Sequence, residues 1–447
     1  MKTYFIIALR NLIQARRRTL LLSFALAAVS LLLVTNLALS RGVSDTMLRS
    51  ATMLVAGHIN VAGFYKNKPQ DAFPVVTVRD ELRAAVTEII GDRGYVLDRG
   101  RGWGKIVSDT TTIQAAMGSI TIAEEPLLRD KLQLAPQSDY KETGSAEILG
   151  NVDNLSEDDT IMIFAGQAKK LEVDVGDSLT ITTETLQGKV NTRDVTIAAI
   201  AKDVGILSMW NIFVPKQVLK DLYGYNSNTT GAVQVYLTEP RLADDIRVEL
   251  ADALVARDFE LMEYMPAPFW QKFEIVSGED WTGQKLDLTT WRDEITFMTW
   301  AVTAIDSISI TLIGILLVII IVGIINTMFI SVRERTREIG SLRAIGMRRR
   351  RVLIMIMTEA FLLGLFASSA GSLLGAGIAS GLDQIGVPVP EGAMRNVLMS
   401  DTLHLVVESS QVTSAILTFT VITMVAALLP ATRAARMQPV TAIQHTS

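Results

Sequence analysis

Four long apolar runs constrain the fold of this 447-residue chain more than any other feature. None of the four contains a charged side chain, and they cover residues 20–39, 307–332, 360–382 and 409–432. At a rise of 1.5 Å per residue, about twenty helical residues cross the roughly 30 Å hydrocarbon core of a bilayer. The mean hydropathy of +0.32 agrees with a membrane protein. We therefore predict four membrane-spanning helices.

Basic residues flank these runs unevenly, and this bias predicts the orientation of the chain. Lysine and arginine residues precede the first run, and arginines follow the fourth. Another eight arginines lie between residues 333 and 351. The segment between the third and fourth runs carries Arg395 against four acidic residues. Because loops rich in arginine and lysine stay in the cytoplasm, we expect both termini and residues 333–351 to be cytoplasmic.

The expected organisation follows from these spans and from their orientation. It comprises a cytoplasmic amphipathic helix (1–18), a first membrane helix (19–40), an extracytoplasmic domain (41–304), a second membrane helix (305–332), a cytoplasmic coupling loop (333–351), a third membrane helix (352–382), a short extracytoplasmic loop (383–408), a fourth membrane helix (409–432) and a cytoplasmic tail (433–447).

The N-terminal run has a second interpretation, as a cleaved signal peptide. Ala38, Leu39 and Ser40 resemble a small-residue cleavage site, although the apolar run is longer than the usual core of a signal peptide. We favour a retained membrane helix. Residues 40–54 and 287–306 continue the first and second spans with helical spacing of apolar residues. We favour stalks that extend the membrane helices outward, and the alternative is helices lying on the membrane surface.

The extracytoplasmic segment has the pattern of an α+β domain. Short β-branched runs predict strands, and longer runs of helical periodicity predict helices between them. The predicted strands are 57–61, 75–78, 160–164, 178–183, 194–200 and 232–237, and the predicted helices are 78–90, 218–223 and 241–257. His58 is the only histidine of this segment and has no accompanying GxSxG motif, so we interpret it as a structural residue.

The composition excludes several classes of function. A net charge of −5 gives no general attraction to nucleic acid. There are no cysteines, so disulfides, zinc–thiolate sites and iron–sulfur clusters are excluded. The three histidines lie far apart in the sequence, and we expect no metal site.

The arginine-rich loop contains a short amphipathic helix. Ile339, Leu342 and Ile345 recur every three residues and form one narrow apolar stripe, with charged residues elsewhere. Such a helix suits docking into a groove of a soluble partner. An arginine-rich helix that binds anionic lipid at the membrane surface remains the alternative.

This loop also carries a family resemblance. The residues concerned are Arg337, Glu338, Ile339, Gly340, Leu342, Arg343, Ala344, Ile345 and Gly346. They resemble the coupling segment of the permeases that include macrolide exporters, lipoprotein-release permeases and the cell-division permease (the MacB, LolC/LolE and FtsX types). The C-terminal residues Pro430, Arg433, Arg436 and Pro439 resemble the same family's end, and residues 8–12 and 17–19 its N-terminal amphipathic helix. In the outer segment the resemblance is weaker and rests on residues 57–61 and 168–179.

The resemblance implies a fold and a set of partners. The fold would be four transmembrane helices with a MacB-like periplasmic core domain on stalk helices, in the bacterial inner membrane. The partners would be two copies of an ABC ATPase, which bind ATP and Mg, and a second permease chain, identical or homologous. The sequence itself has no Walker motif: Gly104-Lys105 and Gly188-Lys189 are each followed by an apolar residue. Because the chain begins at the amphipathic helix, we expect the ATPase to be a separate protein and no cofactor in this chain.

Small residues in the third span predict close helix packing. Gly371 and Gly375, and then Gly377 and Gly381, form two small-xxx-small pairs. They fit either a dimer seam or packing within one chain. Glu359 is costly in lipid and needs a partner, and we expect it to reach the interface or residues 348–351.

The function implied by the resemblance is mechanotransmission. ATP hydrolysis by the partner would move the coupling helix and the spans, and the stalks would carry this motion to the outer domain. The cargo would be a lipoprotein or another lipid-like molecule, with lipoprotein release favoured. The alternatives are efflux with a periplasmic adaptor, a cell-division-type regulator of an outer hydrolase, and a membrane-anchored enzyme.

Overall fold

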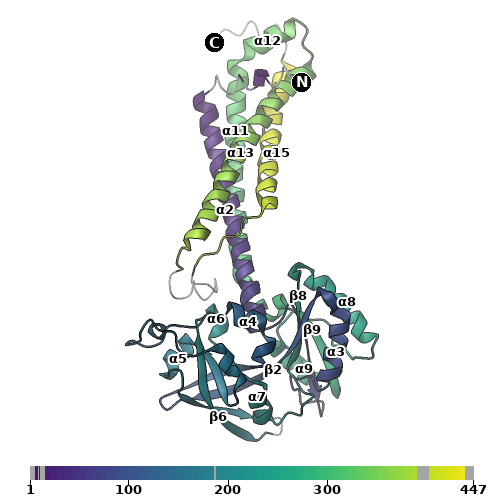
Figure 1. The fold of residues 1–447 in the computed structure, drawn as a ribbon. Coiled ribbons are helices and arrows are strands. Elements are labelled where there is room, and N and C mark those ends of the chain that lie inside the picture. The colour runs from purple at the N-terminus through teal and green to yellow at the C-terminus, as the bar shows by residue number, and fades with distance from the viewer. Residues whose placement is uncertain (1–5, 9, 11–15, 186–187, 390–401, 438–447) are drawn as a thin grey trace. The chain divides into compact units, whose positions relative to one another are not determined.

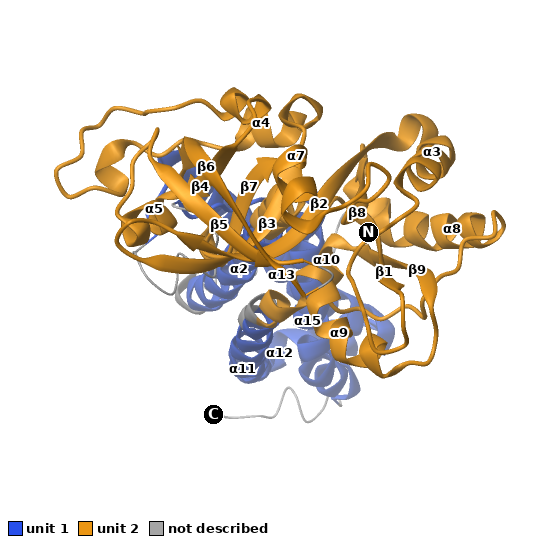
Figure 2. Ribbon diagram, turned by 90° about the horizontal axis from the view of Figure 1, so that it is seen from below, with its two compact units in different colours: residues 1–44, 301–389, 402–447 blue, residues 45–300, 390–401 orange. Residues whose placement is uncertain are grey.

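The computed structural model describes residues 6–8, 10, 16–185, 188–389 and 402–437. The chain divides into two compact units (Figure 2). The helical unit comprises residues 1–44, 301–389 and 402–447, and the outer unit comprises residues 45–300 and 390–401. Most of the predicted amphipathic helix at residues 1–18 lies outside the described residues.

The elements follow one another as labelled in Figure 1. The helices are α2 Arg16–Leu54, α3 Arg79–Ile90, α4 Pro126–Lys131, α5 Ala165–Leu171, α6 Gly205–Ser208, α7 Lys216–Tyr223, α8 Ala243–Val255, α9 Phe269–Gly278, α10 Trp291–Glu294, α11 Thr296–Glu334, α12 Thr336–Ala344, α13 Arg349–Ile385 and α15 Ser409–Arg436. The strands are β1 Ile59–Lys66, β2 Gly94–Val107, β3 Thr112–Ile120, β4 Thr160–Phe164, β5 Ser178–Glu184, β6 Val190–Ala201, β7 Asn211–Pro215, β8 Ala232–Leu237 and β9 Gly283–Thr290.

Four helices among the described residues are long and apolar enough to cross a membrane, which confirms the predicted number. They are Thr19–Leu54, Asp306–Glu334, Arg349–Ile385 and Ser409–Arg436. Helix α2 continues without a break beyond its predicted span to Leu54, and α11 begins at Thr296, ahead of the second predicted span. Residues 40–54 are therefore helical, as both interpretations of this segment required.

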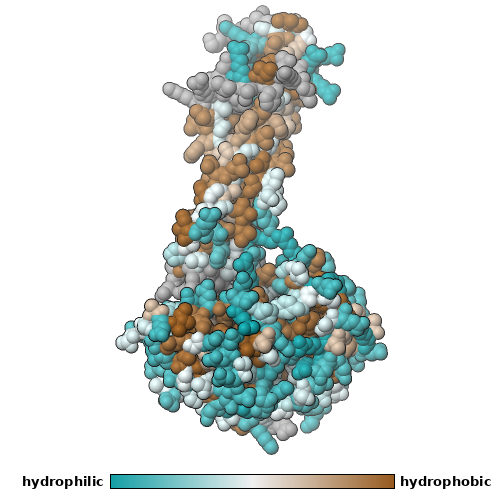
Figure 3. All heavy atoms as spheres, in the orientation of Figure 1, coloured by the Kyte–Doolittle hydropathy of each residue, from teal (hydrophilic) through white to brown (hydrophobic). Residues whose placement is uncertain are grey.

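The helical unit has an apolar core and an apolar surface. Its core includes Leu26 of α2, Ile324 of α11, Leu363 of α13 and Phe419 of α15, all buried. Large apolar side chains such as Ile310 of α11 stay exposed on the outside, where Figure 3 shows brown residues along the helices. An apolar surface around an apolar core is expected of helices that face lipid.

One mixed sheet organises the outer unit. Its strand order is β3-β7-β4-β6-β5-β2-β8-β1-β9, and an additional pairing of β3 with β2 closes one half on itself. The first residues of β2, Gly94 to Arg99, pair with β8, whereas Gly100 to Val107 pair with β3. Strand β2 therefore belongs to both halves, and each half has its own apolar core.

The predicted elements of the outer unit are mostly present, with two corrections. Residues 75–78 are not a strand, because only one isolated pairing, Val76 with Thr230, occurs there. Asp287 to Thr290 are not helical, because they form the end of β9 and pair with β1. The helix predicted over residues 287–306 is therefore a strand end, the short helix α10 and then α11.

Strand β2 was not predicted because glycines interrupt its pattern. Gly100 and Gly102 face helix α7, where added Cβ atoms would lie 2.7 and 2.8 Å from Leu219. Only glycine allows α7 to lie this close to the strand. The close packing that holds β2 in place therefore removes the alternation of side chains by which a strand is recognised.

His58 has a structural environment. Its Nδ1 accepts a hydrogen bond from the backbone N–H of Leu237 at 2.8 Å, and its ring packs edge-on against Tyr236. Burial lowers the pKa of His58 to about 4. The side chain is thus a neutral acceptor that joins the start of β1 to the end of β8, as the sequence interpretation expected.

Candidate coupling site

Helix α12 has a well-defined end set by glycine. The N–H of Gly346 donates to the carbonyl of Arg343, and the N–H of Met347 donates to that of Leu342. This pair of bonds is the Schellman arrangement, in which the residue after the cap takes a left-handed conformation. Gly346 has φ +105°, which residues with a side chain rarely adopt. The requirement for glycine at position 346 is thus conformational.

One face of α12 packs against the other helices of its own unit. Ile339 is 2% exposed and lies in a cluster with Val332 of α11, Val352 of α13 and Ala431 of α15. Gly340, beside it, is also buried. Helix α12 is therefore seated on the ends of three membrane helices.

The prediction that Ile339, Leu342 and Ile345 form one apolar stripe is wrong, because they do not share a face of the helix. Ile339 is buried, whereas Leu342 is 36% and Ile345 86% exposed. A helix turns about 100° per residue, so three-residue steps drift by about 60° and Ile339 and Ile345 lie about 120° apart. Ile339 consequently anchors the helix, and only Leu342 and Ile345 remain available to a partner.

Polar contacts attach α12 to the C-terminal motif. The Nη1 of Arg343 donates to the carbonyl of Ala435 at 2.6 Å, and the guanidinium of Arg433 lies 4.9 Å from the ring centre of Phe329 on α11. Pro430 is buried inside α15. The coupling segment and the C-terminal motif, which lie about ninety residues apart in sequence, thus contact each other in the helical unit.

The remaining motif residues are on the surface or outside the described residues. Arg337, Glu338, Ala344 and Arg436 are exposed. Pro439 lies outside the described residues. Arg337, Arg436 and the exposed residues 348–351 give the segments on either side of Leu342 and Ile345 and the end of α15 a surplus of positive charge.

Arg335 lies between the end of α11 and the start of α12, and its side chain also contacts α13. It precedes α12, and its guanidinium lies 3.2 Å from the carboxylate of Glu338 on α12 and 3.2 Å from that of Glu359 on α13. The side chain of Glu359 is 9% exposed. Arg335 is a partner of Glu359 that the sequence did not predict, and the expectation that Glu359 reaches the interface or residues 348–351 stays a prediction. An acidic residue in a span signals only that some cation lies nearby.

The glycine pairs of the third span have different surroundings. A Cβ on Gly371 would lie 2.1 Å from the carbonyl oxygen of Ala27, and one on Gly375 would lie 2.8 Å from that of Leu31. Both glycines therefore allow α13 to contact α2 within the chain. Added Cβ atoms on Gly377 and Gly381 would meet no atom of the described residues within 4 Å.

A comparison with protein families identifies the helical part of the chain. Residues 296–439 match the model of the FtsX-like permease C-terminal domain. This range contains α12, the ion pair of Arg335 and the C-terminal motif. The helical part of the chain is therefore similar to FtsX-like permeases.

Two of the curated proteins that the chain is similar to are permeases by name. The chain is 26% identical over 236 residues to the macrolide export ATP-binding/permease protein MacB of Mannheimia succiniciproducens, covering 53% of this chain and 31% of that protein. It is 34% identical over 123 residues to the ABC transporter permease YvrN of Bacillus subtilis, covering 28% of this chain and 26% of that protein. The chain thus spans a third or less of the length of these relatives.

Two solved structures resemble this chain at low similarity. The periplasmic region of MacB from Actinobacillus actinomycetemcomitans matches 55% of this chain and 94% of that chain, with 10% identity and a TM-score of 0.31. The extracellular domain of the transporter YknZ matches 44% of this chain and 95% of that chain, with 15% identity and a TM-score of 0.29.

Proposed function

We propose that this chain is the permease subunit of an ABC transporter and that a separate ATPase docks on helix α12. The observation that carries this proposal is the two-sided character of α12. Ile339 is buried against α11, α13 and α15, whereas Leu342 and Ile345 are exposed between segments with a surplus of positive charge. A helix fixed on one side and apolar on the other suits insertion into a groove of a soluble partner.

The contacts of α12 provide a route for motion into the helical unit. Arg335 links α12 to α13 through Glu359, and Arg343 links it to α15 through the carbonyl of Ala435. Helix α13 is in turn packed closely against α2 at Gly371. A displacement of α12 by an ATPase would therefore move the spanning helices together rather than α12 alone.

In this mechanism, called mechanotransmission, the membrane helices would transmit the motion of α12 to the outer unit. Helices α2 and α11 each continue as one uninterrupted helix from the helical unit into the outer unit. Rigid helices of this length can carry a push or rotation to the sheet of the outer unit. ATP and Mg would be bound by the ATPase, in two copies, and a second permease chain would complete the complex.

The orientation of the chain in this proposal follows from its arginines. The corner formed by α12 and the end of α15 carries the surplus of basic residues, and such loops stay in the cytoplasm. The outer unit would then lie outside the cytoplasm, with both termini inside, in the bacterial inner membrane.

The cargo that we favour is a lipoprotein released from the outer face of the membrane. Its basis is the resemblance of the motifs to lipoprotein-release permeases. Efflux with a periplasmic adaptor is the second candidate, because several of the matched relatives are macrolide export proteins by name.

Gentle purification of the tagged chain from its native cells tests the proposal. Mass spectrometry of the co-eluting proteins should identify an ABC ATPase, and Ile345→Asp should remove it. Val190→Asp is the matched control, because Val190 is also an exposed apolar residue (72%) but belongs to the outer unit.

The accompanying proteins separate the two cargo classes. Lipoproteins with the ATPase support release, and an adaptor with an outer-membrane channel supports efflux. If no ATPase co-elutes with the unaltered chain, or if both substitutions remove it equally, docking through α12 is contradicted.

A further inference from the structure

Strand β2 carries a buried arginine, Arg99, and a largely buried one, Arg101, whose side chain is 11% exposed, near the end of α2 and the residues that precede α11. Arg99 and Arg101 are two residues apart, so their side chains leave the strand on the same side. All the groups that they contact belong to the outer unit. Arg99 contacts the end of α2, and Arg101 faces the short helix α10 that precedes α11.

Arg99 holds the end of α2. Its Nη1 donates to the carbonyl of Met53 at 2.9 Å, and its Nε and Nη2 form a two-bonded pair with Glu125, both at 2.7 Å. The side chains of Arg99 and Glu125 are 4% and 3% exposed. A cation among the last carbonyls of a helix also interacts favourably with the helix dipole.

Two further side chains from β8 complete this attachment. The hydroxyl of Tyr236 donates to the carbonyl of Thr52 at 2.9 Å, and the amide of Gln234 donates to that of Val55 at 3.1 Å. Three carbonyls at the end of α2 are thus satisfied by the sheet. Within the described residues, none of the four side chains of this attachment has a buried polar atom without a hydrogen-bond partner.

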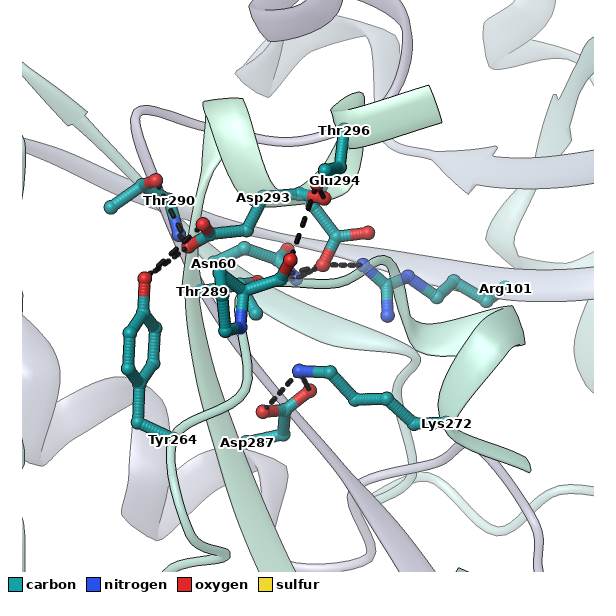
Figure 4. A network of polar contacts seen from close by, with 11 residues as sticks. Asn60, Arg101, Tyr264, Lys272, Asp287, Thr289, Thr290, Asp293, Glu294 and Thr296 are labelled. Atoms are coloured by element: carbon teal, nitrogen blue, oxygen red, sulfur yellow. Dashed lines mark hydrogen bonds and ion pairs between the residues drawn. The ribbon is translucent and has the colours of Figure 1, made fainter. Parts of the chain in front are cut away.

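Arg101 faces the beginning of α11 through Glu294 of α10. Glu294 Oε1 accepts hydrogen bonds from Thr289 of β9 at 2.7 Å and from Asn60 of β1 at 3.1 Å. Figure 4 shows the guanidinium of Arg101 pointing toward this carboxylate, with Nη2 at 3.8 Å from Oε1. The ring of Phe269 lies 4.3 Å from the guanidinium carbon on another side.

This second attachment is incomplete, unlike the first. Within the described residues, Nη1 and Nη2 of Arg101 and Oε2 of Glu294 are buried and have no hydrogen-bond partner. The one nearby ion pair, Lys272 with Asp287 at 2.7 Å, is already formed. Burial lowers the pKa of Arg101, and the nearby carboxylates of Glu294 and Asp287 offset this only in part. A buried cation whose donors are unpaired is a costly arrangement.

A small movement would complete the pair. Charge-assisted hydrogen bonds between guanidinium and carboxylate measure about 2.7–2.9 Å, so the two groups would approach by about 1 Å. We propose that Arg101 and Glu294 form a movable joint, open here and closed in a second state, while Arg99 keeps α2 fixed to the same strand. Arg101 is then a positioning residue that makes the start of α11 shift relative to α2.

The position of β2 gives this joint its reach. Because β2 pairs with β8 in one half of the sheet and with β3 and β5 in the other, a shift of the strand acts on both halves. Gly231 also leaves room for Arg101, since an added Cβ would lie 2.6 Å from its Cγ. The use of the joint for transport rests on the proposed function, whereas its two states do not.

Distances between spin labels test the joint directly. The chain has no cysteine, so Arg49→Cys on α2 and Trp300→Cys on α11 provide two unique label sites with exposed side chains. Pulsed electron resonance on the full chain in nanodiscs should show two distance populations. Arg101→Met should leave one population and an unchanged thermal midpoint, because methionine fills the site without a charge.

A second variant and a nucleotide measurement keep the outcomes separate. Glu294→Gln retains the acceptor for Thr289 and Asn60 but removes the charge, and it should also leave one population. Identical distributions in the unaltered chain and in both variants would overturn the joint.

In the complex with its ATPase, Mg-ATP should shift the two populations. If they depend on Arg101 but ignore Mg-ATP, the joint stands and the proposed ATP coupling fails.

Discussion

A comparison of two glycines on the same helix tests the packing of the helical unit. In Gly371→Ala the new Cβ would lie 2.1 Å from the carbonyl oxygen of Ala27, about 1.3 Å short of the 3.4 Å at which ordinary contact begins. In Gly377→Ala the new Cβ would meet no atom of the described residues within 4 Å. The contact made by Gly371 is with backbone, so no side chain can move aside.

The expected magnitude follows from two opposing effects. Replacing glycine by alanine inside a helix favours folding by about 0.8–1 kcal/mol in both variants. Overpacking at Gly371 disfavours folding by about 1–3 kcal/mol, since α2 and α13 must separate. The difference between the variants removes the shared helix effect, so Gly371→Ala should be less stable than Gly377→Ala by about 1–3 kcal/mol.

Temperature-dependent size-exclusion chromatography of the full chain in mild detergent measures this difference. Gly371→Ala should lose its monodisperse peak several degrees below Gly377→Ala, which should match or exceed the unaltered chain. Equal midpoints for the two variants would refute the close contact of α13 with α2. A lower midpoint for Gly377→Ala alone would instead indicate that a second chain covers that face.

Three further outcomes are expected from individual side chains. The pKa of His58 is lowered from 6.5 to about 4, so the unfolded chain binds the extra proton between these pH values. Stability should therefore fall by at most about 3 kcal/mol as pH drops from 6.5 to 4, and chemical unfolding at several pH values should show that His58→Asn removes this dependence. Glu359→Ala should lower the thermal midpoint more than Glu359→Gln, because a glutamine oxygen can still accept the hydrogen bond from Arg335 and alanine cannot. Ser30→Ala should cost about 1 kcal/mol or less, measured by the same chromatography, since it removes the 2.7 Å hydrogen bond to Ser372.

The sequence predicted best those elements that a run of consecutive residues is enough to indicate. The strand limits at 160–164 and 232–237 were predicted as the structure has them, because both are short runs rich in β-branched and aromatic residues. Strand β2 was missed because its glycines serve a contact with α7, which no local pattern records. The four spanning helices were predictable for the same reason as the short strands, from long runs without charge.

The candidate site was predictable in position but not in orientation. Spacing and resemblance both pointed to residues 337–346, but they could not say that Ile339 faces its own chain and Ile345 the outside. The partner of Glu359 is Arg335, 24 residues earlier in the sequence. The meeting of α12 with Ala435 likewise depends on tertiary packing, which the sequence pattern of either segment does not contain.

The most direct test of the account asks what touches helix α12 in the cell membrane. Because the chain has no cysteine, Ile345→Cys carries a single reactive site, and a thiol-linked photo-crosslinker placed there should capture an ABC ATPase. Ile385→Cys is the matched control, because Ile385 is also exposed (76%) but lies at the C-terminal end of α13, the opposite end of that helix from α12. An ATPase adduct from position 345 and none from position 385 is the predicted result. Adducts with lipid alone at position 345, or equal ATPase capture at both positions, would contradict docking on α12.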